Sequence, residues 1–281
     1  MKMQNIDVMY KNQDDTFSIT RRKFDSYNCK HVHGTYEMLY LFSGERSFFI
    51  NDRTLKMKVG DIVLISPNIL HRAIDAGHQE CEGILLYFHE DYLANACTIN
   101  QTFLKLFENE YLLISLPINE RDYIEEIFKN MLQELQTENT GYELLLYNGL
   151  IQILVFLLRY IKQNNTRIFD YPSPIHEKIS EIVRYINSHY MEPLSLTSLA
   201  DSYYISPVYL SKVFKEATSY TLIEYINTVR IKEAKKLLMK SKKKVVKIAE
   251  EVGFGSITNF GRVFKEITGH PPLYYKKIRE I

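Results

Sequence analysis

A short basic phrase occurs twice in the C-terminal part of this 281-residue chain. Residues 209–219 read YLSKVFKEATS and residues 259–269 read NFGRVFKEITG, so both copies contain Val-Phe-Lys-Glu and a following Thr. The offset between the copies is 50 residues here and 49 residues upstream, where Ala200 matches Ala249. The chain therefore repeats one supersecondary unit, with one residue inserted in the turn of the second copy, near GFGS.

Each copy predicts two short helices joined by a tight turn. The first helix carries a small Ala, which two helices need where they cross closely, and the second has apolar residues at helical spacing. This is the helix-turn-helix arrangement, whose second helix enters a DNA major groove. Plain helical hairpins with solvated Lys and Arg faces are the alternative. The residues expected to face inward are Leu210, Val213 and Phe214 in the first copy and Phe260, Val263 and Phe264 in the second.

The charge distribution supports contact with a polyanion at one end of the chain. Residues 172–281 hold 18 Lys and Arg against 11 Asp and Glu, whereas residues 1–171 hold 17 against 23. A long helix expected from Thr221 to Leu238 has about 18 residues and spans roughly 27 Å at 1.5 Å per residue. It can hold two recognition helices about one DNA turn apart, roughly 34 Å. Helical patterns recur at roughly 175–189, 195–203, 207–217, 221–239, 244–251, 257–267 and 271–278.

Residues 175–281 resemble the DNA-binding domain of the AraC/XylS family of bacterial transcription regulators. The second copy, KIAEEVGFGSITNFGRVFKEITGHPPLYYKK, is similar to the family signature except for Lys276, where Arg is usual. In the first copy, Leu222 stands where Pro is common and Ser219 where Gly is. The resemblance implies a sequence-specific DNA-binding regulator of promoter DNA, usually an activator acting with RNA polymerase, that forms a homodimer and responds to a small-molecule effector.

By this resemblance, outward residues early in each second helix contact DNA bases. Arg262 suits a bidentate contact with guanine and Asn259 one with adenine. Lys215 and Lys265, with Lys243 and Lys244, are expected to hold phosphates, which gives affinity without sequence information. The base-contacting set is Ser206, Tyr209, Ser211 and Lys212 in the first copy and Ser256, Thr258, Asn259 and Arg262 in the second.

The N-terminal part predicts a different fold. Residues 17–90 show short β-rich runs broken by turn signals, which indicate an antiparallel barrel or sandwich, and two helices are expected at 119–136 and 142–163. The fold class is therefore α+β with two domains: an N-terminal cupin-like antiparallel β-barrel plus helices, and a C-terminal all-α domain with two helix-turn-helix units. We expect domain 1–165 for effector sensing and dimerisation through its two helices, a linker at 166–174, and the DNA-binding domain at 175–281.

Targeting signals and cysteines point to the cytoplasm. The N-terminus lacks the apolar core of a signal peptide, and three cysteines far apart read as free thiols in a reducing compartment. The most apolar stretch, 144–158, is shorter than the roughly 20 residues that a membrane span needs. We therefore expect it to form a buried or dimer-forming helix, with no membrane partner.

A polar run in the β-rich segment is a candidate ligand site. In HVHGTYEMLYLFSG, His31 and His33 lie on one face of a strand, Glu37 follows, and His71 comes after Pro67. This run resembles the cupin motifs, whose three His and one Glu bind a divalent metal, so a metal-dependent cupin enzyme fused to a DNA-binding domain is an alternative. The sensor domains of AraC-type regulators commonly keep this run without a metal. We therefore expect these four residues to line the effector cavity, with no metal, cofactor or enzyme activity. A protein-interaction adaptor with degenerate DNA units is a third interpretation.

Overall fold

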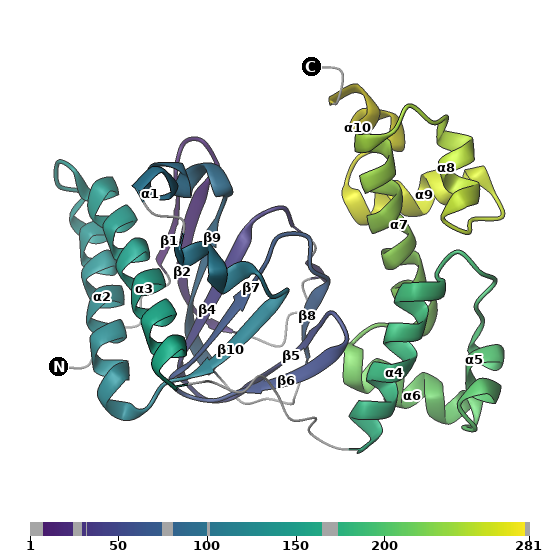
Figure 1. Ribbon diagram of the computed structural model, residues 1–281, viewed down its shortest axis with the longest axis horizontal. Helices are drawn as coiled ribbons and strands as arrows, with labels where there is room; N and C mark the ends of the chain where they lie inside the picture. The colour runs from purple at the N-terminus through teal and green to yellow at the C-terminus, as the bar shows by residue number, and fades with distance from the viewer. Residues whose placement is uncertain are drawn as a thin grey trace. The chain divides into compact units, whose positions relative to one another are not determined.

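The computed structural model describes residues 8–24, 30–31, 33–74, 81–99, 102–164 and 174–278. The chain divides into two compact units, Met1–Pro172 and Ser173–Ile281. The first is β-rich with added helices and the second is all-helical (Figure 1), so the predicted α+β class with two parts is confirmed. The linker predicted at 166–174 lies outside the described residues, except for Pro174, which begins α4.

Two antiparallel sheets form the framework of the first unit. A six-stranded sheet has the order β1-β2-β9-β4-β7-β10, and a four-stranded sheet has the order β3-β8-β5-β6. In the first sheet the strands are β1 (Val8–Lys11), β2 (Phe17–Phe24), β9 (Cys81–Phe88), β4 (Tyr36–Ser43), β7 (Asp61–Ile65) and β10 (Tyr111–Ser115). In the second they are β3 (Lys30–His31), β8 (His71–Ile74), β5 (Arg46–Ile50) and β6 (Arg53–Met57).

Strand alternation separates two apolar cores. In β4, Leu39 and Leu41 belong to a cluster that draws on both sheets, whereas Met38 and Tyr40 belong to a cluster shared with the helices. Successive strand side chains point to opposite faces, so the six-stranded sheet is apolar on both. The space between the sheets is therefore one core, and the helix-covered face is the other.

Helices cover the second face of the six-stranded sheet, where α2 and α3 lie side by side (Figure 1). Both were predicted from their apolar periodicity. Among the described residues, α3 is the one helix long and apolar enough to cross a membrane, with a mean hydropathy of 1.8 in its most apolar window. Core helices can be as long and as apolar as a membrane span. The inner face of α3 packs in the core through Leu146, Leu150, Ile153, Leu154 and Leu157. The elements are η1 (Glu90–Leu93), α1 (Ala94–Ile99), η2 (Thr102–Phe107), α2 (Ile118–Thr137) and α3 (Tyr142–Asn164).

Strands β1 and β10 extend the β-structure beyond the predicted segment 17–90. β10 pairs with β7 along its whole length, with Tyr111 opposite Ile65 and Ser115 opposite Asp61. A run of five residues is too short to show a periodicity, and β10 becomes a strand by pairing with β7, nearly 50 residues earlier in the chain.

The second unit contains seven helices in the described part of the chain, each within one residue of its predicted bounds. Side-chain caps and αL residues explain why the ends are so well defined: α6 and α9 end at Ser219 and Gly269, both in the left-handed region. The helices are α4 (Pro174–His189), α5 (Leu196–Ser202), α6 (Pro207–Thr218), α7 (Leu222–Lys240), α8 (Val245–Glu251), α9 (Ile257–Thr268) and α10 (Pro272–Ile278).

Candidate nucleic-acid interface and sensor site

The two helix-turn-helix units share a buried scaffold. Ala200 in α5 and Ala249 in α8 are fully buried, as a close helix crossing requires. All six residues expected to face inward are also buried, which confirms the predicted packing faces of α6 and α9. Since these shared positions are inside, the two copies differ mainly in what they expose.

Both second helices begin at a serine cap. The Ser206 hydroxyl accepts a hydrogen bond from the backbone N–H of Tyr209 at 3.2 Å, and the Ser256 hydroxyl accepts one from Asn259 at 3.4 Å. Pro207 occupies the first turn of α6, where its missing N–H costs nothing. The two serines predicted to touch bases therefore also fix where each helix starts.

The turns before these helices differ between the copies. Tyr204 in the first turn has a φ of 55° and is 94% exposed, and Gly253 at the equivalent position in the second has a φ of 87°. A Cβ on Gly253 would lie 2.7 Å from the carbonyl oxygen of Met191, so the second turn needs glycine there. The first turn holds a non-glycine residue in the same backbone region at some cost in strain.

The residues predicted to contact DNA are all exposed at α6 and α9. Arg262 Nη1 lies 3.1 Å from Glu266 Oε2, and its Nη2 donates to Asn259 Oδ1 at 3.2 Å. The equivalent pair in α6 is looser, with 3.9 Å between Lys212 Nζ and Glu216 Oε1. Two of the four residues of the second copy that were predicted to contact bases, Asn259 and Arg262, thus contact one another.

Two exposed apolar residues escaped the sequence prediction. Val208, the second residue of α6, is 82% exposed, and Ile257, the first residue of α9, is 44% exposed. Apolar side chains at the start of a recognition helix suit contact with thymine methyl groups. The available signal was an apolar residue outside the inward stripe, one or two residues after each serine cap.

Helix α7 joins the two helix-turn-helix copies within the second unit. Its C-terminal half packs Ile231, Ala234 and Leu238 into the core of the second copy. Near its middle, Arg230 donates to the carbonyl oxygens of Tyr190 at 2.7 Å and Glu192 at 2.8 Å. Partial burial lowers the pKa of Arg230. These contacts tie α7 to the segment after α4 and make it a fixed link.

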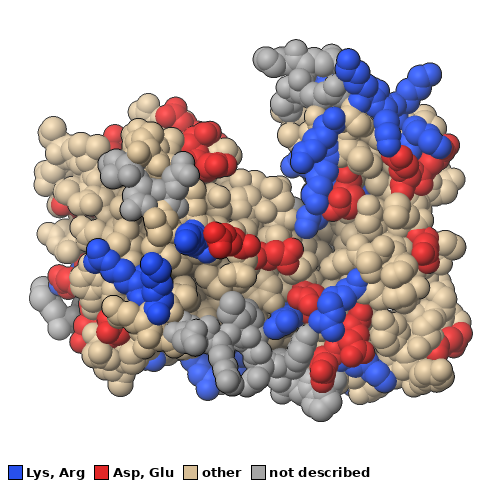
Figure 2. Space-filling view, in the orientation of Figure 1, with Lys and Arg blue, Asp and Glu red and all other residues tan. Residues whose placement is uncertain are grey.

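Basic side chains gather where α7, α8 and α10 meet, as Figure 2 shows. Lys243 Nζ lies 2.6 Å from a Glu251 carboxylate oxygen, and Lys276 Nζ donates to the Lys243 carbonyl at 3.1 Å. Lys244, directly before α8, is exposed. The predicted phosphate contacts at Lys243 and Lys244 therefore lie within a wider basic surface.

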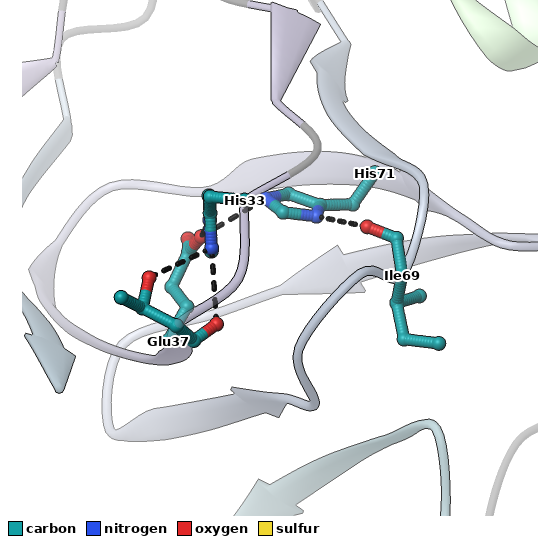
Figure 3. A network of polar contacts seen from close by, with 5 residues as sticks. His33, Glu37, Ile69 and His71 are labelled. Atoms are coloured by element: carbon teal, nitrogen blue, oxygen red, sulfur yellow. Dashed lines mark hydrogen bonds and ion pairs between the residues drawn. The ribbon is translucent and has the colours of Figure 1, made fainter. Parts of the chain in front are cut away.

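In the first unit, three of the four predicted polar residues come together between the sheets (Figure 3). Glu37 lies on β4 and faces the same core as Leu39, His71 begins β8, and His33 precedes β4. Nε2 of His33 and Nε2 of His71 each lie 2.9 Å from Glu37 Oε2. The fourth residue, His31, pairs with His71 in the backbone register of β3 and β8, and its side chain lies outside the described atoms.

The cluster is strongly coupled electrically. Burial alone raises the pKa of a carboxyl group, but His71 and His33 outweigh it and hold the pKa of Glu37 below its usual range. Burial lowers the pKa of an imidazole, but Glu37 and the Ile69 carbonyl outweigh it and raise the pKa of His71. The arrangement stabilises the charged carboxylate form of Glu37. A positive charge must balance it, either on the imidazole rings or on a group held between them.

The first unit has a small cavity beside the Glu37 cluster and a larger groove along two of its helices. A cavity of about 30 Å³ lies beside Glu37 and His71, and Arg22 and Arg46 also line it. A groove of about 500 Å³ runs along α2 and α3 and has Glu120 at its lining. The other residues of the groove are Tyr123, Ile151, Gln152, Val155, Phe156 and Arg159.

Comparison with known proteins matches both units. Residues 18–154 match the family model of the AraC-like ligand binding domain, and residues 199–278 match that of a helix-turn-helix domain. A β-rich ligand-binding unit and a double helix-turn-helix unit define a transcription regulator that binds DNA. The chain belongs to the AraC family of helix-turn-helix transcription regulators, as predicted.

Relatives of this family align with most of the chain in some cases and with a shorter part of it in others. The uncharacterized HTH-type transcriptional regulator YisR of Bacillus subtilis is 24% identical over 260 residues, covering 89% of this chain and 88% of YisR. The bifunctional transcriptional activator/DNA repair enzyme AdaA of Bacillus subtilis is 35% identical over 108 residues, covering 38% of this chain and 51% of AdaA. An apo structure of ToxT from Vibrio cholerae aligns with 95% of this chain and 98% of its own, at 17% identity and a TM-score of 0.42.

Proposed function

We propose that one chain reads two successive major grooves of promoter DNA, with α6 in one and α9 in the other. One observation carries this proposal: the same buried scaffold occurs twice, and the exposed residues at the start of α6 differ from those at the start of α9. Helix α7 has 19 residues and spans about 28 Å. That length suits recognition helices about one DNA turn apart, roughly 34 Å.

The base contacts divide between the copies. In α9, Arg262 donates to guanine and Asn259 pairs with adenine, since the two side chains already lie together on the exposed face. In α6, Lys212 acts as a point charge and Val208 contacts a thymine methyl group. Phosphates are held by Lys215 and Lys265 together with Lys243 and Lys244. Ser206, Tyr209, Ser211, Ser256 and Thr258 complete the contact surface.

The first unit receives the signal and forms the dimer. Glu120 and Arg159, of opposite charge, share the groove along α2 and α3. A two-fold axis at such a groove places the acidic part of one copy against the basic part of the other, around the apolar lining. Effector binding at this unit changes how the dimer presents its DNA-binding units to a promoter. The regulator acts in the cytoplasm, as an activator in contact with RNA polymerase.

A regulatory role, without enzyme activity, fits the size of the polar cavity. A substrate or other drug-sized ligand needs a pocket of about 300–1,000 Å³. The cavity beside Glu37 and His71 measures about 30 Å³, well below that range. The relatives with matching length are named as transcriptional regulators.

Selection of binding sites from a random DNA library, with the full-length chain, tests the two-groove proposal. We expect an enriched site with two blocks of specified bases about 10 base pairs apart. Lys212→Ala should relax one block and Arg262→Ala the other, each costing about 1–3 kcal/mol at its block. Lys265→Ala should weaken all sequences alike and reduce the salt slope by about 0.9.

The control is Lys129→Ala, which removes an exposed Lys from α2 in the other unit. It should leave both blocks and the salt slope unchanged. A library that yields no enriched sequence contradicts DNA reading outright. A site with a single block, or two variants that relax the same block, contradicts the assignment of one groove to each copy.

A further inference from the structure

We propose that the first unit binds one divalent transition-metal ion through Nε2 of His33, Nε2 of His71 and the Glu37 carboxylate. The three ligand atoms all lie within 4.8 Å of one another. This inference rests on the proposed function, because it names the ligand class of the sensor site. It departs from the expectation drawn from the sequence alone, which favoured a site without metal.

The spacing of the donor atoms fits a shared ion. Each ring nitrogen lies 2.9 Å from Glu37 Oε2. Nitrogen and oxygen ligands sit about 2.0–2.2 Å from a metal such as zinc, so two ligands at a right angle lie about 3 Å apart. The two imidazole rings are nearly perpendicular, with an interplanar angle of 76° and centroids 5.0 Å apart. Each ring thus points its Nε2 atom at the Glu37 carboxylate (Figure 3).

Hydrogen-bond partners at Nδ1 bear on the ring tautomers that metal ligands need. Nδ1 of His71 lies 2.9 Å from the Ile69 carbonyl oxygen, which only accepts, so a proton of this ring belongs on Nδ1. Nδ1 of His33 lies 3.0 Å from the Thr35 carbonyl oxygen and 2.9 Å from the Thr35 hydroxyl, which can donate or accept, so the carbonyl favours the same tautomer without fixing it. In the neutral His71 ring, Nε2 then offers its lone pair toward Glu37. A histidine ligand held by a carbonyl at its other nitrogen is the usual outer arrangement of a metal site.

Burial and charge complete the argument. The side chains of His71 and Glu37 are 2% and 5% exposed, so the carboxylate needs a positive charge nearby. The adjoining cavity of about 30 Å³ is large enough to hold a water molecule, which suits an ion with an open position. Two neutral imidazoles and a carboxylate are the donor set of sites for Fe, Co, Ni or Zn.

Two guanidinium groups also line the cavity and must be reconciled with a cation. The Arg46 guanidinium lies 4.3 Å above the ring of Phe24, and that of Arg22 lies 5.1 Å from the same ring. Both positive charges therefore have an aromatic partner, Phe24, which also lines the cavity. An anion completing the metal's coordination sphere would lie between the ion and these groups.

Titration of the full-length protein with Co²⁺, after treatment with a chelator, tests the site. We expect about one Co²⁺ per chain and the appearance of visible absorption bands, reversed by added Zn²⁺. His33→Gln should weaken Co²⁺ binding at least tenfold, and the 22% exposure of the His33 side chain lets this variant keep its fold. His89→Gln is the matched control, because it removes a half-exposed histidine of the same unit, which pairs with Asp91.

Glu37→Gln serves as a second ligand variant, provided that its circular dichroism matches that of the parent. The absence of Co²⁺ uptake by the parent overturns the metal site, as does uptake that persists in His33→Gln and folded Glu37→Gln. Binding-site selection on the same preparation separates the two proposals. Sequence-specific DNA binding without Co²⁺ uptake removes only the metal, whereas Co²⁺ uptake without DNA selectivity removes the proposed function and leaves the ion site.

Discussion

Glu266 holds Arg262 in place on the exposed face of α9, and its replacement by glutamine isolates what that restraint does. Arg262 Nη1 and Glu266 Oε2 lie 3.1 Å apart, one helical turn from each other, with both side chains about two-thirds exposed. In the proposed DNA complex, Glu266→Gln removes one negative charge from a surface that faces phosphates and frees the guanidinium to reach them. We expect stronger binding to random DNA and a lower ratio of specific to random affinity.

The magnitude follows from the exposure of this pair. Ion pairs this exposed contribute about 0.3–0.5 kcal/mol, and relief of repulsion from phosphate adds a similar amount. Together they amount to about 0.5–1 kcal/mol, a two- to fivefold gain on random DNA. One added phosphate contact also steepens the salt slope by about 0.9. On the selected site Arg262 already contacts a base, so the affinity there should change less than about twofold.

Fluorescence anisotropy with labelled selected and scrambled duplexes, over a series of salt concentrations, measures both affinities. Glu126→Gln on α2 is the matched control, because Glu126 also lies 3.1 Å from a basic partner, Lys129, one turn away on an exposed helix. Equal gains on both duplexes in Glu266→Gln would show that only net charge changed. An unchanged affinity for scrambled DNA would refute the restraint.

Four further substitutions test the packing, the turns and the dimer. Gly253→Ala should lower the free energy of unfolding by at least about 2 kcal/mol in urea denaturation, because the backbone there is left-handed and Met191 crowds the new Cβ. Tyr204→Gly, at the equivalent position of the first copy, should change the free energy of unfolding by under about 1 kcal/mol. Phe264→Ala removes a fully buried ring and should cost about 3–5 kcal/mol by the same measurement. Phe156→Glu places a charge in the groove along α2 and α3 and should shift sedimentation toward the monomer without loss of helical signal; an unchanged dimer would place the interface elsewhere.

The sequence predicts the helical unit more completely than the β-rich unit, for a physical reason. A helix is specified by residues within about one turn of each other, so the serine caps and the inward stripes fix α6 and α9 locally. A strand depends on a partner far along the chain. β10 pairs with β7 across more than 40 residues, and nothing within YLLIS indicates that pairing.

The same distinction applies to the candidate sites. The exposed residues of α6 and α9 follow from the repeat and from helical periodicity, so their side of the helix was predictable. The spacing of His33 and Glu37 predicts their proximity, but the contact of His71 with Glu37 depends on two sheets that pack together. The carbonyl partners of the two rings and the size of the adjoining cavity have no counterpart in the sequence.

We expect the two copies of the repeat to differ in how strictly they discriminate between bases, because their exposed residues differ on a shared scaffold. Both carry a glutamate one turn after the basic residue, Glu216 after Lys212 and Glu266 after Arg262, but only the second pair is close, at 3.1 Å against 3.9 Å. A guanidinium held in one orientation presents a planar fork to guanine, whereas an ammonium group is a mobile point charge. Since the buried positions are equivalent, selectivity must come from these exposed differences. The block of DNA read by α9 should therefore tolerate fewer substitutions than the block read by α6.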